Sequence, residues 1–182
     1  MLLLAWFVLL SQNLFAQNQA VGDYIGRICH RLSPNTEVLL VNDTEVKASA
    51  LSGGSIEIST ALLARLQNEA ELAGVLAHEV AHLAAKTDCV RFVITSRERS
   101  RDQEHEREAD EAAIRTLTKA GYDPVAMLDF FSKYRHERTD LPMTFSARDL
   151  LIERLQIEAT DHPLKDPIRN TPEFDSVHGL LK

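Results

Sequence analysis

The sequence lacks an excess of positive charge. Its 182 residues include 20 Lys and Arg against 27 Asp and Glu, which gives a formal net charge of -7 and a pI near 5.5. Aromatic residues make up only 6% of the chain, and no segment combines them with basic residues in a patch. Nucleic-acid-binding domains typically carry such a basic surface. We therefore expect no nucleic-acid partner.

Long hydrophobic runs are missing after the N-terminus. The one apolar run, residues 1–10, is too short to span a bilayer as a helix. Polar residues follow it, and Ala16 could precede a cleavage point. We predict that residues 1–16 are a signal peptide of an exported protein and that residues 17–182 form a single domain. The run has no positively charged start, and Leu14 stands where a small residue is usual. An uncleaved anchor that keeps the protein at the membrane is therefore the alternative.

Cysteine is scarce, because Cys29 and Cys89 are the only two in the chain. In an exported protein they could form a disulfide, or they could remain two separate buried thiols. Neither is placed to be a catalytic nucleophile. The sequence leaves the pairing open, and it leaves the oligomeric state open as well.

The remaining composition is that of a globular protein, with 45% hydrophobic residues and enough length for one domain with a core. Helical spacing of apolar residues predicts helices over residues 17–32, 60–66, 69–87 and 96–120, with two more beginning after residues 123 and 149. Alternating patterns predict strands over residues 37–42, 46–51 and 55–59. No repeat or second domain is present. The expected fold is α+β, with a small, mostly antiparallel sheet packed on the 69–87 helix.

The 69–87 helix, which opens with a capping box formed by Asn68 and Glu71, carries the main motif. On its polar side His78 and His82 lie one turn apart with Glu79 between them, in the pattern H-E-x-x-H. Two imidazoles at this spacing can bind one Zn²⁺, and the carboxylate can take a proton from metal-bound water. The motif is short, and a polar strip is often only the solvent face of a helix. A zinc site requires a further protein ligand.

The helix over residues 96–120 supplies that candidate ligand. Its apolar residues place Glu106 and Asp110 on the buried side, whereas its other carboxylates fall on the opposite side. A buried carboxylate is unfavourable unless it is paired or binds a metal. We therefore predict that Glu106 is the third zinc ligand and that the fourth position is open for water. Asp110 would orient one ligand imidazole through its other ring nitrogen. The alternative is a buried ion pair of Asp110 with an arginine.

The pair H-E-V-A-H and E-R-E-A-D resembles the HtpX/BepA-type zinc metallopeptidases, gluzincins that include the CAAX prenyl protease. The segments G-G-S-I-E-I-S-T-A-L-L and A-G-Y-D-P-V-A-M are also similar, so the resemblance covers about residues 37–169. It implies a zincin-like, minimal gluzincin domain with one Zn²⁺ per chain, bound by His78, His82 and Glu106, and with Glu79 as catalytic base. It also implies a metalloendopeptidase of cell-envelope quality control. Such an enzyme would cleave unfolded or misassembled proteins in the periplasm, alongside envelope assembly partners.

Two residues near the C-terminus resemble the family's H-P…R element, but their spacing is irregular. His162 could block the open metal position or line the substrate cleft. Arg169 could stabilise a developing oxyanion or pair with Asp110. An ordinary exposed loop would also explain the segment. The competing function is a zinc-containing, chaperone-like binding protein with little or no protease activity, and the intact Glu79 argues against it.

Overall fold

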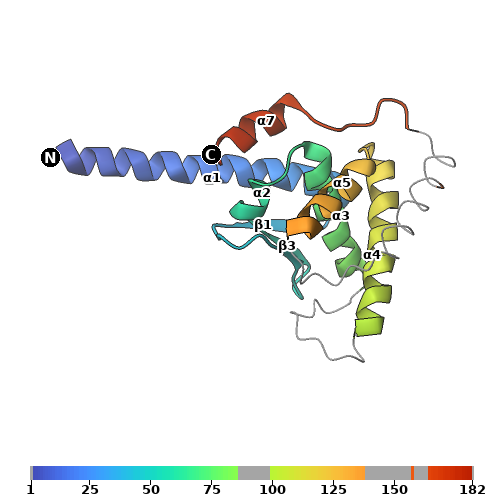
Figure 1. The fold of residues 1–182 in the computed structure, drawn as a ribbon. Coiled ribbons are helices and arrows are strands. Elements are labelled where there is room, and N and C mark those ends of the chain that lie inside the picture. Colours follow the sequence, from blue (N-terminus) through green and yellow to red (C-terminus); the bar gives the residue numbers. More distant parts are fainter. Residues whose placement is uncertain (1, 86–98, 138–156, 158–163, 182) are drawn as a thin grey trace.

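The computed structural model describes residues 2–85, 99–137, 157 and 164–181 (Figure 1). Its helices are α1 (Leu2–Leu32), α2 (Thr60–Leu63), α3 (Glu69–Ala85), α4 (Arg99–Ala120), α5 (Val125–Glu137) and α7 (Pro172–Gly179). Its strands are β1 (Glu37–Val41), β2 (Ala48–Ala50) and β3 (Ser55–Ser59). The fold is α+β, as predicted. α3 lies at its centre, in contact with α1, α4, α5 and β2.

The sheet is mixed rather than mostly antiparallel. Its strand order is β1-β3-β2, with β3 parallel to β1 and antiparallel to β2. The chain passes from β1 directly to β2 and then returns through a turn at Gly54, whose φ is 86°, so that β3 fills the place between the two earlier strands. β3 buries Ile56 and Ile58 completely, in the alternation expected of a strand. β2 is therefore an outer strand of the described sheet.

The N-terminal helix is longer than the sequence predicts. We expected a helix over residues 17–32, whereas α1 is continuous from Leu2 to Leu32. Figure 1 shows its first half extending away from the other elements. Val21, Ile25 and Ile28 are buried, which confirms the predicted helical spacing. Among the described residues, no helix is both long and apolar enough for a membrane span.

α3 is more deeply buried than an amphipathic helix would be. The sequence predicts one apolar face, yet every residue from Glu69 to Ala77 is buried. α5 approaches so closely that a Cβ added to Gly74 would lie 2.8 Å from Cβ of Met127. Glu71 is buried in the predicted capping box, where its N–H donates to Oδ1 of Asn68 across 2.9 Å. Only the last two turns of α3 have a polar side that reaches the surface.

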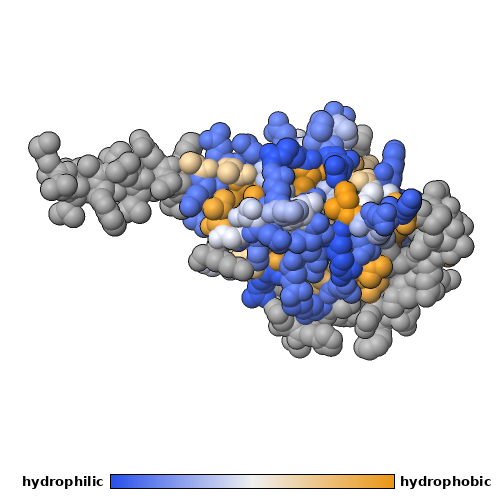
Figure 2. All heavy atoms as spheres, turned by 90° about the horizontal axis from the view of Figure 1, so that it is seen from above, coloured by the Kyte–Doolittle hydropathy of each residue, from blue (hydrophilic) through white to orange (hydrophobic). Residues whose placement is uncertain are grey.

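α4 and the C-terminal segment close the domain. α4 buries Ala113, Ile114 and Leu117, the residues that the sequence places on its inner side. Gly121, with a φ of 84°, ends it, as predicted. α7 then packs against α1 through the buried Phe174. Seen from above, the described surface is mostly hydrophilic with small, separate apolar areas (Figure 2).

Candidate metal centre

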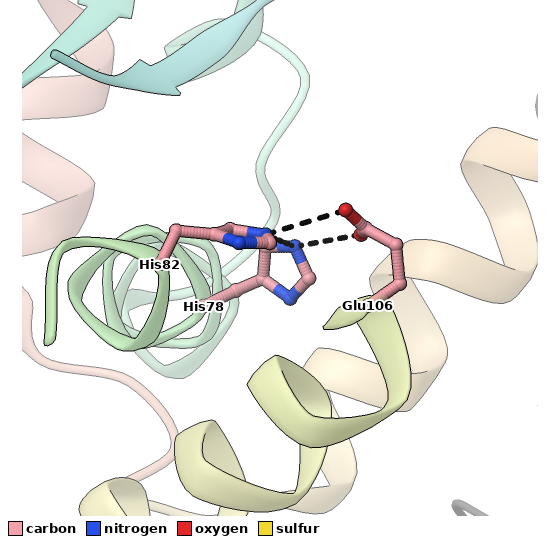
Figure 3. Close-up of side chains that lie close together, drawn as sticks. All are labelled: His78, His82 and Glu106. Carbon is pink, nitrogen blue, oxygen red and sulfur yellow. Dashed lines mark hydrogen bonds and ion pairs between the residues drawn. The ribbon is translucent and has the colours of Figure 1, made fainter. Parts of the chain in front are cut away.

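His78 and His82 project from the same side of α3 toward α4 (Figure 3). Their Nε2 atoms lie 3.0 Å apart, and the two rings meet edge to face with centroids separated by 4.7 Å. The side chains are only 11% and 13% exposed. The i, i+4 spacing on a helix produces this arrangement, as the sequence predicts.

Glu106 of α4 lies opposite the two imidazoles. Its Oε2 is 3.2 Å from Nε2 of His78, and its Oε1 is 3.4 Å from Nε2 of His82. Three ligands placed tetrahedrally around Zn²⁺ at about 2.0–2.1 Å would be separated by roughly 3.3 Å. The observed separations and the His₂Glu donor set therefore fit a zinc ion. The Glu106 side chain is 48% exposed, so it lies at an open edge of the site and not in the core.

Asp110 lies one turn after Glu106 and is the buried carboxylate of this pair, with 6% of its surface exposed. Its Oδ1 is 2.9 Å from Nδ1 of His78. Nδ1 therefore carries a proton and donates it to Asp110, so that Nε2 is the ring nitrogen that faces Glu106 and would bind a metal. The predicted alternative, an ion pair of Asp110 with Arg169, is not what the structure has.

The charges of the cluster stabilise one another. Burial alone would lower the pKa of His78, but hydrogen bonds to Asp110 and Glu106 outweigh it and raise that pKa well above its usual value. Burial would likewise raise the pKa of Glu106, and hydrogen bonds from His78 and His82 hold it far below its usual value. The cluster thus keeps a carboxylate ionised beside two imidazoles, as a cation site requires.

Glu79 follows His78 on α3 and lies against β2. Its Oε2 accepts a hydrogen bond from the backbone N–H of Ala50, at 2.8 Å. β2 is therefore the strand that contacts the candidate site through Glu79. The contribution of Ala50 could not be predicted, because a backbone donor leaves no side-chain pattern.

The two ambiguous C-terminal residues have different outcomes. His162 and its predicted roles lie outside the described residues. Arg169 lies near the N-terminus of α3. Its guanidinium nitrogens lie 2.6 Å from Oδ2 of Asp123 and 2.6 Å from Oδ2 of Asp129. Its carbonyl also accepts the N–H of Ala70, at 3.0 Å. The observed partners of the guanidinium are thus two carboxylates, Asp123 and Asp129, and not the predicted groups at the metal centre.

Comparison with known proteins gives an independent view of the chain. Residues 18–100 match the model of Peptidase family M48. Over 188 aligned positions the chain is 27% identical to a Vibrio cholerae protein provisionally named a beta-barrel assembly-enhancing protease, covering 76% of this chain and 39% of that protein. It is 27% identical over 154 positions to the beta-barrel assembly-enhancing protease of Yersinia pestis, covering 60% and 32%.

The protein of the same name from Escherichia coli K12 is 26% identical over 131 positions, covering 52% of this chain and 27% of that protein. The chain thus spans well under half the length of these relatives. The matched segment contains the complete H-E-x-x-H motif, and the α4 carboxylates complete the donor set beside it. The motifs, the zincin-like α+β fold and these matches agree, and all of them make the chain similar to the M48 peptidases, the family that its sequence motifs resemble.

Proposed function

We propose that the chain is a zinc-dependent metalloendopeptidase with one Zn²⁺ per chain, bound by His78, His82 and Glu106. One observation carries the proposal: the ligand atoms of these three residues, from two different helices, lie within 4.8 Å of one another. Bound zinc would act as a Lewis acid that polarises the scissile carbonyl and the attacking water.

The residues around the ligands have distinct roles in this proposal. Glu79 accepts a proton from the attacking water and delivers it to the leaving amine. Asp110 holds the ring of His78 in one tautomer and orientation. β2 offers its outer side to an extended peptide, which could pair with it through backbone hydrogen bonds and so be bound with broad sequence tolerance.

The substrates we propose are unfolded or misassembled proteins of the cell envelope. Support comes from the relatives, whose names link them to the assembly of β-barrel proteins. We propose export to the periplasm by residues 1–16, with retention of these residues as a membrane anchor as the alternative. Residues 17–182 would then form the single peptidase domain.

The test is cleavage of casein by purified protein of known zinc content. Glu79→Gln should retain zinc and lose cleavage, because the amide cannot accept the proton. Glu106→Gln should lose both zinc and cleavage. Glu108→Gln, an exposed carboxylate on the same helix, is the matched control and should change neither. Zinc-free wild type, or undiminished cleavage by Glu79→Gln, would refute the proposal.

The competing function is a zinc-containing, chaperone-like binding protein. It predicts that wild type and Glu79→Gln prevent aggregation of an unfolded protein equally well, with no cleavage by either. The two functions therefore differ in one measurement, the appearance of new peptide termini in the wild-type reaction.

A further inference from the structure

The hydrogen bond between Ala50 and Glu79 joins the sheet to the proposed catalytic base. The N–H belongs to the last residue of β2, which is 1% exposed, and the carboxylate belongs to the central helix. At 2.8 Å between N and Oε2, it is a short N–H···O contact to a charged acceptor, one of the stronger kinds of hydrogen bond. A rigid backbone donor therefore holds one oxygen of a flexible side chain.

The pairing of β2 with β3 explains why this N–H is available. The N–H of Leu51 donates to the carbonyl of Ser55, so residue 51 faces β3. In an antiparallel pair the hydrogen-bonded positions alternate, so Ala50, opposite Ile56, directs its N–H to the outer side of β2. Ala48, two residues earlier, stands at the equivalent position and also directs its N–H to the outer side.

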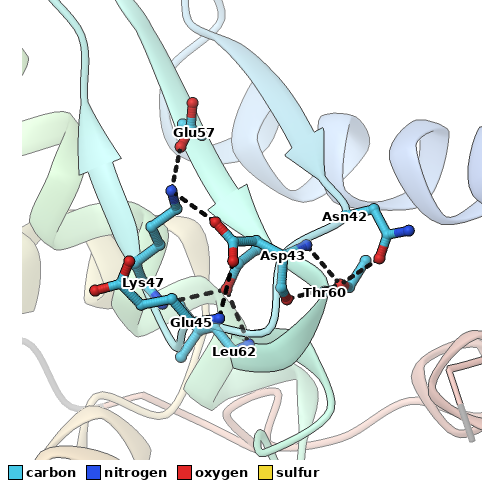
Figure 4. Close-up of polar contacts among 8 residues, drawn as sticks. Asn42, Asp43, Glu45, Lys47, Glu57, Thr60 and Leu62 are labelled. Atoms are coloured by element: carbon cyan, nitrogen blue, oxygen red, sulfur yellow. Dashed lines mark hydrogen bonds and ion pairs between the residues drawn. The ribbon is translucent and has the colours of Figure 1, made fainter.

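Polar contacts at the start of β2 fix this register (Figure 4). Nζ of Lys47 lies 2.9 Å from Oδ2 of Asp43 and 3.3 Å from Oε1 of Glu57, so one side chain joins the β1–β2 connection to β3. A slip of one residue would turn the N–H of Ala50 toward β3 and away from Glu79. The contact to Glu79 is therefore a property of the sheet and not of a mobile loop.

We propose that the backbone N–H of Ala50 is a positioning group for Glu79. The inference rests on the proposed function, in which Glu79 is the base. The hydrogen bond holds Oε2 at β2 and leaves Oε1 to accept the proton of the attacking water. A glutamate side chain samples several rotamers, and general-base catalysis depends on geometry, so a fixed donor raises the fraction of productive conformers. Because Glu79 occupies the N–H of Ala50, a peptide that pairs with β2 forms its hydrogen bonds with other backbone groups of the strand.

The contact itself is tested without any peptidase assay, by amide hydrogen exchange in zinc-loaded wild type and in Glu79→Ala. The Ala50 amide should be protected in wild type and should exchange at least about tenfold faster in the variant. The Leu51 amide, bonded to the carbonyl of Ser55, is the internal control and should not change. Equal exchange of Ala50 in the two proteins would overturn the inference, even if the peptidase activity is established.

The role is tested with Ala50→Pro, which removes the N–H on an outer strand, and with Ala48→Pro as its matched control. Ala50→Pro should lower kcat about 10- to 100-fold at unchanged zinc content and nearly unchanged KM, because binding is retained while the base is misplaced. Ala48→Pro removes an outer N–H that a paired peptide can use, so it should raise KM and retain kcat. A kcat for Ala50→Pro equal to that of Ala48→Pro, or higher than wild type, would overturn the inference.

A second variant covers the case in which proline unfolds the strand. Replacement of Ala50 by lactic acid exchanges the N–H for an ester oxygen and changes no side chain. This protein should show the same loss of kcat, with a circular-dichroism spectrum and zinc content equal to those of wild type. Full activity of the ester would overturn the positioning role, whereas inactivity of the wild type itself would refute the proposed function instead.

Discussion

Oδ1 of Asp110 lies 2.9 Å from Nδ1 of His78, and the two side chains are 9% and 11% exposed. The carboxylate can only accept, so Nδ1 carries a proton and donates it, and Nε2 is the ring nitrogen that remains for a metal. Nε2 is the atom that faces His82 and Glu106. The pair therefore fixes the orientation of the His78 ring, with Nε2 directed to the proposed metal position.

Asp110→Asn should weaken zinc binding by roughly 10- to 100-fold, because the neutral amide holds the imidazole less strongly and adds a competing donor. Competition with a chromophoric chelator measures the affinity directly. Glu108→Gln provides the control for the loss of one negative charge on α4. If Asp110→Asn binds zinc as tightly as that control does, the carboxylate has no influence on the ligand.

Helical periodicity accounts for the part of the site that the sequence predicted. The apolar residues of α4 determine which side faces α3, and that side carries Glu106 and Asp110. The degree of burial was less predictable. Asp110 is enclosed, whereas Glu106, one turn earlier, lies at an edge and is half exposed. Periodicity gives the direction of a side chain, but exposure depends on where the neighbouring element ends.

Contacts between distant segments account for the part that was not predicted. The parallel pairing of β1 with β3 depends on the path of a connection, which the strand patterns do not contain. Arg169 pairs with Asp123 and Asp129, some 40 residues earlier in the chain, and no local pattern distinguishes these carboxylates from Asp110. The hydrogen bond from Ala50 to Glu79 uses a backbone N–H, so the residue pattern of the sequence could not predict it either.

Removal of zinc should destabilise the fold, because the three ligands come from two helices that the metal would hold together. A ligand that binds only the native state stabilises it by about 2.7 kcal/mol when present at 100 times its Kd. Thermal unfolding with and without a chelator should therefore show a lower Tm for the stripped protein. Glu106→Gln should unfold at the same temperature in both conditions. A chelator effect that persists in this variant would point to a different metal site.

Gly74→Ala should destabilise the fold by about 1–3 kcal/mol through overpacking. The added Cβ would lie 2.8 Å from Cβ and 3.1 Å from Cα of Met127, and the backbone atom cannot move without shifting α5. Gly22→Ala in α1 is the matched control, because nothing lies within 4 Å of its added Cβ. That control should be stabilised by about 0.5–1 kcal/mol through higher helix propensity. Urea unfolding measures both, and equal effects would contradict the close approach of α3 and α5.

Glu69→Gln should destabilise the fold by about 2–4 kcal/mol, since the buried carboxylate accepts hydrogen bonds from three hydroxyl groups. Tyr24 and Tyr122 donate at 2.8 and 2.9 Å, and Thr171 donates as well. The NH₂ group of glutamine is a hydrogen-bond donor, and it would face hydroxyl groups that also need an acceptor. Urea unfolding should show the exposed Glu37→Gln unchanged. A loss no larger than that of Tyr122→Phe, which deletes one donor, would indicate that the network rearranges around the amide.

Cys29 should be a thiol in the native protein. It is completely buried, and its Sγ lies 3.7 Å from the carbonyl oxygen of Thr36, a weak contact in which an S–H group donates. Cys89, its predicted disulfide partner, lies outside the described residues. Without reductant, a thiol reagent at pH 8 should therefore modify Cys29 slowly in the native protein and rapidly in denaturant. The absence of reactive thiols in denaturant would instead establish the disulfide.

Burial raises the pKa of the Cys29 thiol from 9.0 to about 11. The unfolded chain thus releases this proton at a lower pH than the folded protein does, and the contribution of Cys29 to stability falls as pH rises from 9 to 11. The full loss is about 2–3 kcal/mol. Cys29→Ala has no such proton, so its stability relative to wild type should improve across this window, as urea unfolding at pH 8 and pH 11 can measure. A constant difference between the two proteins would show that the folded thiol ionises as readily as the unfolded one.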